Sequence, residues 1–482
     1  MTSFSAIVKL TCRSAVRSHV FQFLLFVLLL GVLLVPNTIK GDGTAYGYMQ
    51  VSLEYSFTFI TVMLMLSGVW LGCQTMTADV EDCRLHLIVV KPVSRYVVWL
   101  GKFTGVLAVL AALLLISSAV VYGFILYQSG RQDFPPEERA RMENEVLTGR
   151  RAYRPELPDV KAIALKAFNE KKNSQGVLIS QVLTGDDRAK AIDVIYRQIV
   201  AAMAEIPAGK TRYWLYKGLP DKIPDDSTFF IRYRAYSGMV DVQQSQDHGY
   251  GAWGAVINYI EKPDPKSLKP GEKAPDPVPA QVYVSRQPEQ ILTAAMNEFE
   301  LPADGIIANG EAVIGFTNLA PNGKPLVIQV ADGPTLLLKE TGFFANYVRG
   351  VFMIFLGVTA SVLVAVSLAS FLSMPTAIFI TISYMAFGFF ASFLISSEAT
   401  YGGLDMPAMD LYGYWLGRTL HSMIIPLQKF GISDAIANGE LIELSVIGSA
   451  ILFQIVLKGV PLALLGAWLY NRRELSLAAI RR

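Results

Sequence analysis

The chain has 482 residues, of which 52% are hydrophobic and only 17% are charged, with a formal net charge of +2. Soluble domains carry roughly a quarter charged residues, so this composition argues against an ordinary soluble protein. The net charge gives no indication of nucleic-acid binding, and no basic run outside the short inner segments indicates it either. The apolar residues are gathered into blocks, which favours membrane-spanning helices.

Six apolar blocks qualify to cross a hydrocarbon core of about 30 Å, which takes about 20 residues of helix, the first being short and extended at either end by polar-tolerant turns. They predict a polytopic α-helical membrane protein with six transmembrane helices, three within residues 20–127 and three within residues 347–482. The blocks are residues 20–35, 57–75, 106–127, 347–372, 377–395 and 446–470.

The basic residues predict the orientation, because cytoplasmic segments carry an excess of Lys and Arg. The segments assigned to the inner side hold most of them, and both termini are expected to be cytoplasmic in the plasma (inner) membrane. Residues 1–19 are expected to form an interfacial helix whose cations lie among lipid phosphates, although a plain basic flank would satisfy the same bias. The inner basic residues are Lys9, Arg13, Arg17, Arg84, Lys91, Arg95, Lys102, Arg472, Arg473, Arg481 and Arg482.

Residues 128–346 contain no spanning block and are rich in charge, Pro and Gly, so they predict a folded extracytoplasmic domain. Apolar residues recur at helical spacing in 191–204, whereas alternation in 231–235 and at least four later segments predicts strands. The expected fold is α+β with a β-sandwich-like part. The later strands are 281–285, 312–316, 326–330 and 335–338.

Residues 396–445 form a predicted outer loop with an unusual composition. Its segment 411–430 mixes Tyr412, Tyr414 and Trp415 with Arg418. Such a mixture favours an interfacial or partly re-entrant helix over a seventh span.

The inner segment between the second and third blocks, residues 77–103, is too long and too patterned for a simple connector. It has an acidic start, an apolar run, a Pro that interrupts any helix, and then basic residues around an apolar face. Short amphipathic elements of this kind suit docking into a groove on a partner protein. The alternative is a basic membrane-flanking loop without a partner.

This segment resembles the inner-loop motif of ABC exporter permeases of the type-two (ABC-2) superfamily, through Lys91-Pro92-Val93-Ser94-Arg95 and the Gly101-Lys102 that follows. The ending Tyr470-Asn471-Arg472-Arg473-Glu474-Leu475 is also similar to that family. The resemblance covers the membrane region, about half of the chain, and the large insertion departs from the minimal family pattern. It implies an ATPase-coupling loop containing Glu81, Asp82, Arg84, Leu87, Lys91, Pro92, Ser94, Arg95 and Lys102.

The resemblance further implies a homodimer or heterodimer of permeases driven by a separate ABC ATP-binding subunit, which would bind ATP and Mg. No cofactor is expected in this chain itself. Histidines are dispersed, and no catalytic triad or metal-binding pattern appears, so neither an enzyme nor a metal site is predicted.

The last block contains Lys458 and Gln454 within otherwise apolar sequence. A cation at that depth is costly and marks a function or a buried partner by default, so both residues are candidates for a substrate path. Snorkelling of Lys458 to the interface is the alternative.

Together these features predict a transport permease that exports an amphipathic or envelope-related substrate among membrane lipids. The rival is a membrane-anchored scaffold or receptor whose external domain binds an envelope partner without transport.

Overall fold

A computed structural model describes residues 3–38, 44–81, 93–130, 135–171, 178, 183, 185–220, 228–237, 248–257, 281–284, 289–303, 306–307, 310–320, 323–329, 333–398 and 408–472. The chain divides into two compact units. A helical unit comprises Met1–Gly149, Thr341–Ala399 and Leu411–Arg482, and a β-rich unit consists mainly of Arg150–Glu340.

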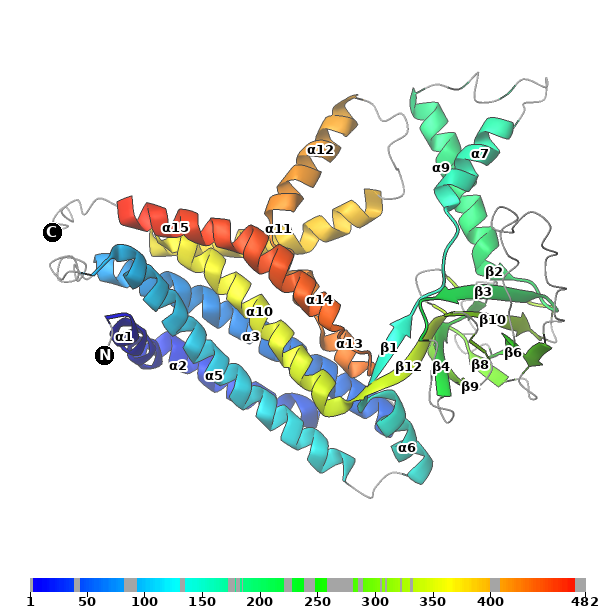
Figure 1. Cartoon of the computed structure of the whole chain (residues 1–482), viewed down its shortest axis with the longest axis horizontal. Helices are drawn as coiled ribbons and strands as arrows, with labels where there is room; N and C mark the ends of the chain where they lie inside the picture. Colours follow the sequence, from blue (N-terminus) through cyan, green and yellow to red (C-terminus); the bar gives the residue numbers. More distant parts are fainter. Residues whose placement is uncertain are drawn as a thin grey trace, which may run out of the picture. The chain divides into compact units, whose positions relative to one another are not determined.

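The helical unit contains long helices, most of which lie side by side over much of their length, and several short ones (Figure 1). In chain order they are α1 (Ser3–Arg17), α2 (His19–Thr38), α3 (Ala45–Glu81), α5 (Arg95–Ser129), α6 (Pro136–Glu145), α10 (Phe343–Ala369), α11 (Met374–Glu398), α12 (Ala408–Met423), η2 (Leu427–Phe430), α13 (Ser433–Ala437), α14 (Leu444–Ser449), η3 (Ala450–Gly459) and α15 (Val460–Arg472).

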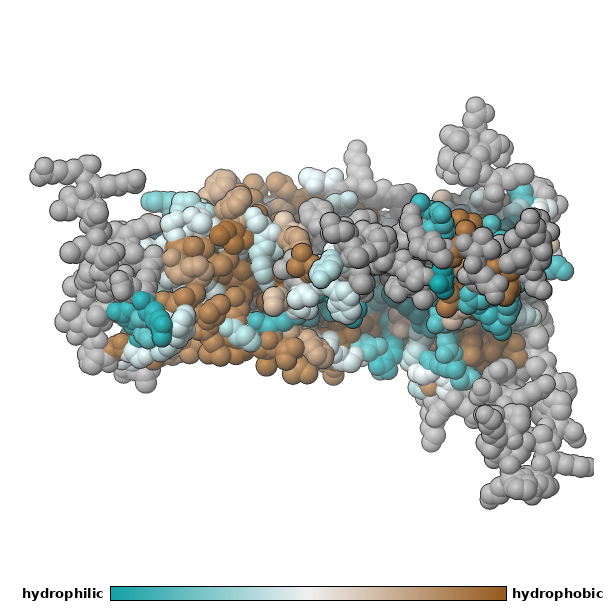
Figure 2. Space-filling model, turned by 90° about the horizontal axis from the view of Figure 1, so that it is seen from above, coloured by the Kyte–Doolittle hydropathy of each residue, from teal (hydrophilic) through white to brown (hydrophobic). Residues whose placement is uncertain are grey.

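Five helices in the described part of the chain are long and apolar enough to cross a membrane. They are α2, α3, α5, α10 and the continuous helix formed by α14, η3 and α15. The fifth predicted block falls in α11, where the apolar stretch Met374–Phe389 is shorter than the others. The predicted membrane-type helices are therefore present, but the count of six is not established. Figure 2 shows the matching broad apolar surface over the helical unit.

Two helices extend well beyond the apolar blocks that predicted them: α3 covers Ala45–Glu81 where the block was 57–75, and α5 covers Arg95–Ser129 where the block was 106–127. α5 begins at Arg95, so residues 95–103, which were predicted as loop, are helical. Val98, Trp99 and Lys102 are buried there, because the first turns of α5 pack against neighbouring helices. Tertiary packing thus continues the helix past the end of the hydrophobic signal.

α10 lies at the centre of the helical unit. In its most apolar stretch 72% of the residues are buried, whereas the corresponding share for α2 is 22%. α10 packs most extensively against α3, and glycines make the approach close. A Cβ added to Gly68 would lie 2.8 Å from Val362 Cγ2, and one on Gly72 would lie 3.1 Å from the Cβ of Ala365. Small residues at such crossings let helix backbones approach closely inside membranes.

The contacts along α10 define two ends of the helical unit. At the insertion end, where α3 and α10 begin and α5 finishes, the ring of Tyr347 lies 5.2 Å from that of Phe57. At the terminal end, where α3, α10 and α15 finish and α5 begins, Trp99 Nε1 donates to Ser370 Oγ at 2.9 Å. α3 and α10 therefore run parallel, and α5 runs antiparallel to both.

In its described residues the β-rich unit contains three sheets, with strand orders β1-β12-β4-β9, β3-β10-β6-β7 with β8 also paired to β6, and β2-β11-β5. Its strands are β1 (Thr148–Tyr153), β2 (Glu205–Ile206), β3 (Thr211–Lys217), β4 (Thr228–Arg234), β5 (Tyr236–Ser237), β6 (His248–Ile257), β7 (Gln281–Val284), β8 (Glu289–Leu292), β9 (Met296–Pro302), β10 (Glu311–Asn318), β11 (Leu326–Val327) and β12 (Thr335–Gly342). Its helices are α7 (Val160–Glu170) and α9 (Gly185–Ala204).

Two of these sheets share one hydrophobic core. The ring of Tyr233 on β4 lies 4.8 Å from Trp253 on β6 and 6.0 Å from Phe316 on β10, measured between centroids. Tyr216 is buried in the same core, where its hydroxyl donates to the carbonyl of Pro334 and burial raises the pKa of its phenol well above the usual value. The inner faces of the two sheets therefore meet as in a sandwich.

All five predicted strand segments overlap observed strands, but of 326–330 only Leu326–Val327 is a strand, and residues 285 and 330 lie outside the described residues. The predicted helix 191–204 lies within α9. β6 was not predicted, because Gly249, Gly251 and Gly254 weaken its strand signal. Gly251 has a packing role instead: a Cβ there would lie 2.2 Å from the ring of Phe316.

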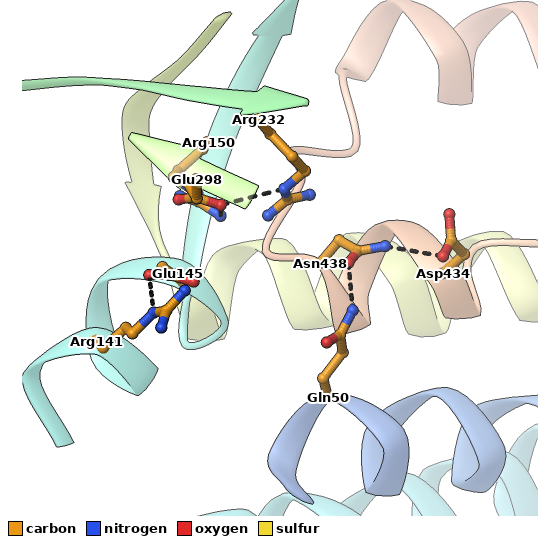
Figure 3. Close-up of polar contacts among 8 residues, drawn as sticks. All are labelled: Gln50, Arg141, Glu145, Arg150, Arg232, Glu298, Asp434 and Asn438. Carbon is orange, nitrogen blue, oxygen red and sulfur yellow. Dashed lines mark hydrogen bonds and ion pairs between the residues drawn. The ribbon is translucent and has the colours of Figure 1, made fainter. Parts of the chain in front are cut away.

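A buried charge cluster joins three strands of the first sheet (Figure 3). Glu298 on β9 accepts from Arg150 on β1 and, at 3.2 Å, from Arg232 on β4, and the three side chains are at most 6% exposed. Arg150 also lies over the ring of Phe230, 5.1 Å from its centroid. Breaking a buried ion pair by removing one partner is strongly destabilising, because a charge is left in a low-dielectric site.

The basic-residue asymmetry predicts that the insertion and the termini lie on opposite sides of a membrane. A Lys171→Cys variant, altered at an exposed position after α7, should react with a membrane-impermeant maleimide in intact cells, while the wild-type protein should label only after permeabilisation. Mass spectrometry of the purified chain would locate the label. Labelling of wild-type Cys12 in intact cells would contradict this orientation.

The segment 148–342, expressed alone, is expected to fold, since it contains its own core. Glu298→Gln keeps the shape of the side chain and removes its charge, so it should lower the free energy of unfolding by about 3–5 kcal/mol. Urea unfolding followed by tryptophan fluorescence would measure this loss.

Glu340→Gln is the matched control, because Glu340 pairs with Arg151 at 3.6 Å while both side chains stay exposed. That change should lower the free energy of unfolding by at most about 1 kcal/mol. Equal losses in the two variants would show that the cluster has no special role.

Candidate functional site

The predicted coupling loop is only partly within the described residues. Asp82, Arg84, Leu87, Lys91 and Pro92, together with the side chain of Glu81, lie outside them. Ser94 immediately precedes α5, and its carbonyl accepts from the amides of Val97 and Val98.

The first turns of α5 are tied to three other helices at the terminal end. Arg95 Nη1 donates to the carbonyl of Asn471 on α15 at 3.0 Å, and Lys102 Nζ donates to the carbonyl of Thr75 on α3 at 2.6 Å. Trp99 completes the set through its bond to Ser370, just after α10. Lys102 is only 5% exposed, so it is a buried contact inside the bundle rather than an exposed loop cation.

The helix α1 docks on this same part of α5. A Cβ on Gly101 would lie 2.8 Å from Ile7, and one on Gly105 would lie 2.7 Å from Thr11. The thiol of Cys12 donates to the carbonyl of Gly105 at 3.4 Å. The apolar side of α1, predicted to lie in lipid, is thus partly used against protein, whereas Lys9, Arg13 and Arg17 are exposed.

At the other side of the unit, the chain between α12 and α13 turns at mid-depth of the helices. Phe430 of η2 packs against Gly357 in the middle of α10, where an added Cβ would lie only 3.0 Å from Phe430. The Ile425 amide donates to Tyr384 Oη on α11 at 2.8 Å, and Gln428 Nε2 donates to the Phe389 carbonyl at 2.8 Å. We call residues 424–431 the internal turn.

Lys458 meets the end of α12 at this internal turn. Its Nζ donates to the carbonyl of Ile424 at 2.6 Å and to that of His421 at 3.4 Å. The sequence left two alternatives for this cation, a place in a substrate path and snorkelling to the interface. The structure gives Lys458 two different protein acceptors.

Gln454 lies one turn before Lys458 and is 4% exposed. Its Oε1 has no hydrogen-bond partner among the described residues. Both residues belong to η3, a π-helical stretch, and such stretches in α-helices frequently coincide with functional sites.

The chain then returns to the insertion end, where polar contacts hold α13 (Figure 3). Gln50 of α3 donates to Asn438 Oδ1 at 2.6 Å, and Asn438 Nδ2 donates to Asp434 at 2.8 Å. Asn346 of α10 bonds the chain on both sides, to the Glu440 carbonyl and the Ile442 amide, each at 2.8 Å.

Sequence reasoning did not identify Gln50, Tyr384, Asn346 or Asn438. Tyr384 and Asn346 lie within or beside predicted spans, and polar side chains at those places are the signal that could have found them. Their partners are backbone groups of the outer loop, which pattern analysis does not reveal. No group of His, Cys, Asp or Glu that could hold a metal occurs among the described residues.

Comparisons with known proteins add nothing to this geometry: no family model, no curated protein and no solved structure matches the chain.

The docking of α1 predicts a specific change in the reactivity of Cys12. Gly105→Val should displace α1, because a side chain there overlaps Thr11 and lies 3.2 Å from the Val8 carbonyl. Burial raises the pKa of the Cys12 thiol. Displacement of α1 should therefore expose Cys12 to the alkylating reagent and increase the fraction of the thiol that is thiolate. Alkylation of the solubilised protein, followed by mass spectrometry, should show faster modification of Cys12.

Gly123→Val is the matched control on the same helix, since a Cβ at Gly123 meets nothing within 4 Å. It should leave the rate of Cys12 modification at the wild-type value. An unchanged rate in Gly105→Val would show that α1 does not depend on this contact.

Proposed function

We propose that the chain is the membrane-spanning permease subunit of an ATP-driven exporter of the ABC-2 type. A separate ATP-binding subunit binds ATP and Mg, and two permease chains form the pathway. The termini lie in the cytoplasm, and the β-rich unit lies outside the membrane.

The observation that supports this function most directly is the bonding of α5 at the terminal end. The helix begins immediately after the Lys91-Pro92-Val93-Ser94-Arg95 motif, and Arg95, Trp99 and Lys102 connect its first turns to α15, the end of α10 and α3. A displacement applied to the loop by a partner is therefore passed at once to three further helices. A membrane anchor that only holds an external domain has no need of such connections.

The cargo is proposed to be amphipathic, as envelope lipids and their conjugates are. The described spans carry few charges, and Lys458 is already bonded to backbone carbonyls, so no strongly polar lining supports an ionic cargo. The exposed apolar residues on α2 and η3 suit contact with lipid or with a second permease chain.

The rival function, a scaffold that binds an envelope partner, is favoured by one observation: the β-rich unit has a core of its own. A scaffold requires no ATPase, so purifying the chain and testing for an associated ATP-binding subunit separates the two functions.

We expect the tagged chain, purified from its source membrane, to retain a subunit with Mg-dependent ATP hydrolysis. With ATP and vanadate, the maleimide labelling rate of a Tyr127→Cys reporter at the insertion end should change. Replacing both Glu81 and Arg95 by Ala should leave the complex assembled and remove this nucleotide dependence, because the connection from the loop to α15 is lost.

Arg13→Ala, which removes an exposed cation of α1, should behave as wild type. A pure and monodisperse chain without any ATP-binding subunit would favour the scaffold. A complex in which the double variant still responds to nucleotide would show that the loop does not couple the two subunits.

A further inference from the structure

The position of Lys458 shows that α12 ends deep inside the helical unit. The continuous helix Leu444–Arg472 has 29 residues, and Lys458 is 14 residues from either end. At about 1.5 Å per residue this is roughly 21 Å from Arg472, which is past the midplane of a hydrocarbon core about 30 Å thick when Arg472 lies at its boundary. The internal turn begins at Ile424, which Lys458 contacts, and at its other end Phe430 packs beside Gly357 in the middle of α10.

A helix that ends at this depth leaves backbone carbonyls without helical partners, and no water is present in the hydrocarbon core to donate hydrogen bonds to them. The two carbonyls that Lys458 contacts are those of His421, in the last turn of α12, and Ile424, the first residue after it. The His421 carbonyl also accepts from the Ile424 amide at 3.2 Å, so the shorter bond to Ile424, at 2.6 Å, is the main contribution of Lys458. The negative end of the helix dipole also favours a cation there. The ammonium and the helix end thus stabilise each other.

The remainder of α12 exposes several large apolar side chains. Tyr412, Trp415, Leu416 and Met423 are each more than half exposed. The described contacts that fix the end of the helix are those of the internal turn, with Tyr384 and Gln428 on one side and Lys458 on the other. The direction of α12 therefore depends on this end.

The π-helical character of η3 makes the Lys458 contact reversible. A π-helical stretch carries extra residues per turn, so a return to α-helical bonding rotates its side chains relative to the flanking helix. Gln454, buried in the same stretch without a partner for its Oε1 among the described residues, is a polar group that the present arrangement leaves unsatisfied. Both features lower the free-energy difference between the present conformation of η3 and a second one.

We propose that Lys458 is a positioning residue that holds α12 through its last carbonyls, and that release of this contact during the transport cycle frees α12 to swing at the internal turn. The release step rests on the proposed export function, whereas the holding step does not. In this mechanism the cation binds no cargo, and the movement of α12 opens the path beside the turn.

Spin labels on the full-length chain in nanodiscs test the holding step without nucleotide or partner. The labels replace Thr419 on α12 and Leu464 on α15, both exposed, with Cys12 and Cys83 changed to Ser and the fully buried Cys73 retained. Lys458→Met should broaden or shift the distance distribution, and Lys458→Arg, which keeps a cationic donor, should restore the narrow one. Lys429→Met, which removes an exposed neighbouring cation, should resemble wild type.

A Lys458→Met distribution identical to wild type would overturn the proposal, as would an equal change in Lys429→Met. If Lys458→Met does not accumulate, Lys458→Gln takes its place and should show the same broadening. The release step is tested in the complex with its ATP-binding subunit, where vanadate trapping should move the wild-type distribution toward that of Lys458→Met. An unchanged distance distribution in the vanadate-trapped complex would overturn the release step. If no ATP-binding subunit is found, the proposed function is overturned and the holding step still stands.

Discussion

The packing of α10 against α3 is the interaction on which the rest of the helical unit depends. α10 is the most buried of the candidate spans, and its approach to α3 is close because Gly68 and Gly72 carry no side chain to keep the backbones apart. Inside a bilayer, lipid tails compete equally with apolar side chains, so close packing rather than hydrophobicity selects helix pairs. α5 and α15 then pack on α10, and the internal turn is set against its middle beside Gly357.

The second constraint is the need to satisfy backbone polar groups at membrane depth. Non-helical backbone is tolerated there only where protein supplies the partners. At the internal turn the Ile425 amide uses the Tyr384 hydroxyl, and the carbonyls of His421 and Ile424 use Lys458. A buried cation and a buried helix end would each be unfavourable alone, but they stabilise each other when paired. This explains why Lys458 is placed in an otherwise apolar helix.

The two ends of the helical unit differ in the kind of contact they use. The terminal end is connected through long basic and aromatic side chains of α5 that reach neighbouring helices, an arrangement suited to passing on a displacement. The insertion end is connected through amides: Gln50 bonds Asn438 and Asn346 bonds the chain after α13, while the Asp434 carboxylate bonds Asn438 within the same short segment. Amide pairs carry no net charge, so they can separate and re-form without leaving an isolated ion in a low-dielectric site.

The sequence by itself determined the membrane-type helices, the β-rich insertion and the candidate cation at Lys458, because apolar block length, strand alternation and a charge inside an apolar block are all local signals. It did not give the helical start of α5, the docking of α1 on Gly101 and Gly105, the glycine-rich strand β6, or the partners of Lys458. Each of these depends on residues far apart in the chain. Burial of Trp99 and Lys102 extends α5 beyond its hydrophobic block, the ring of Phe316 gives Gly251 its place in a strand, and carbonyls more than 30 residues from Lys458 become its acceptors only when α12 ends beside η3.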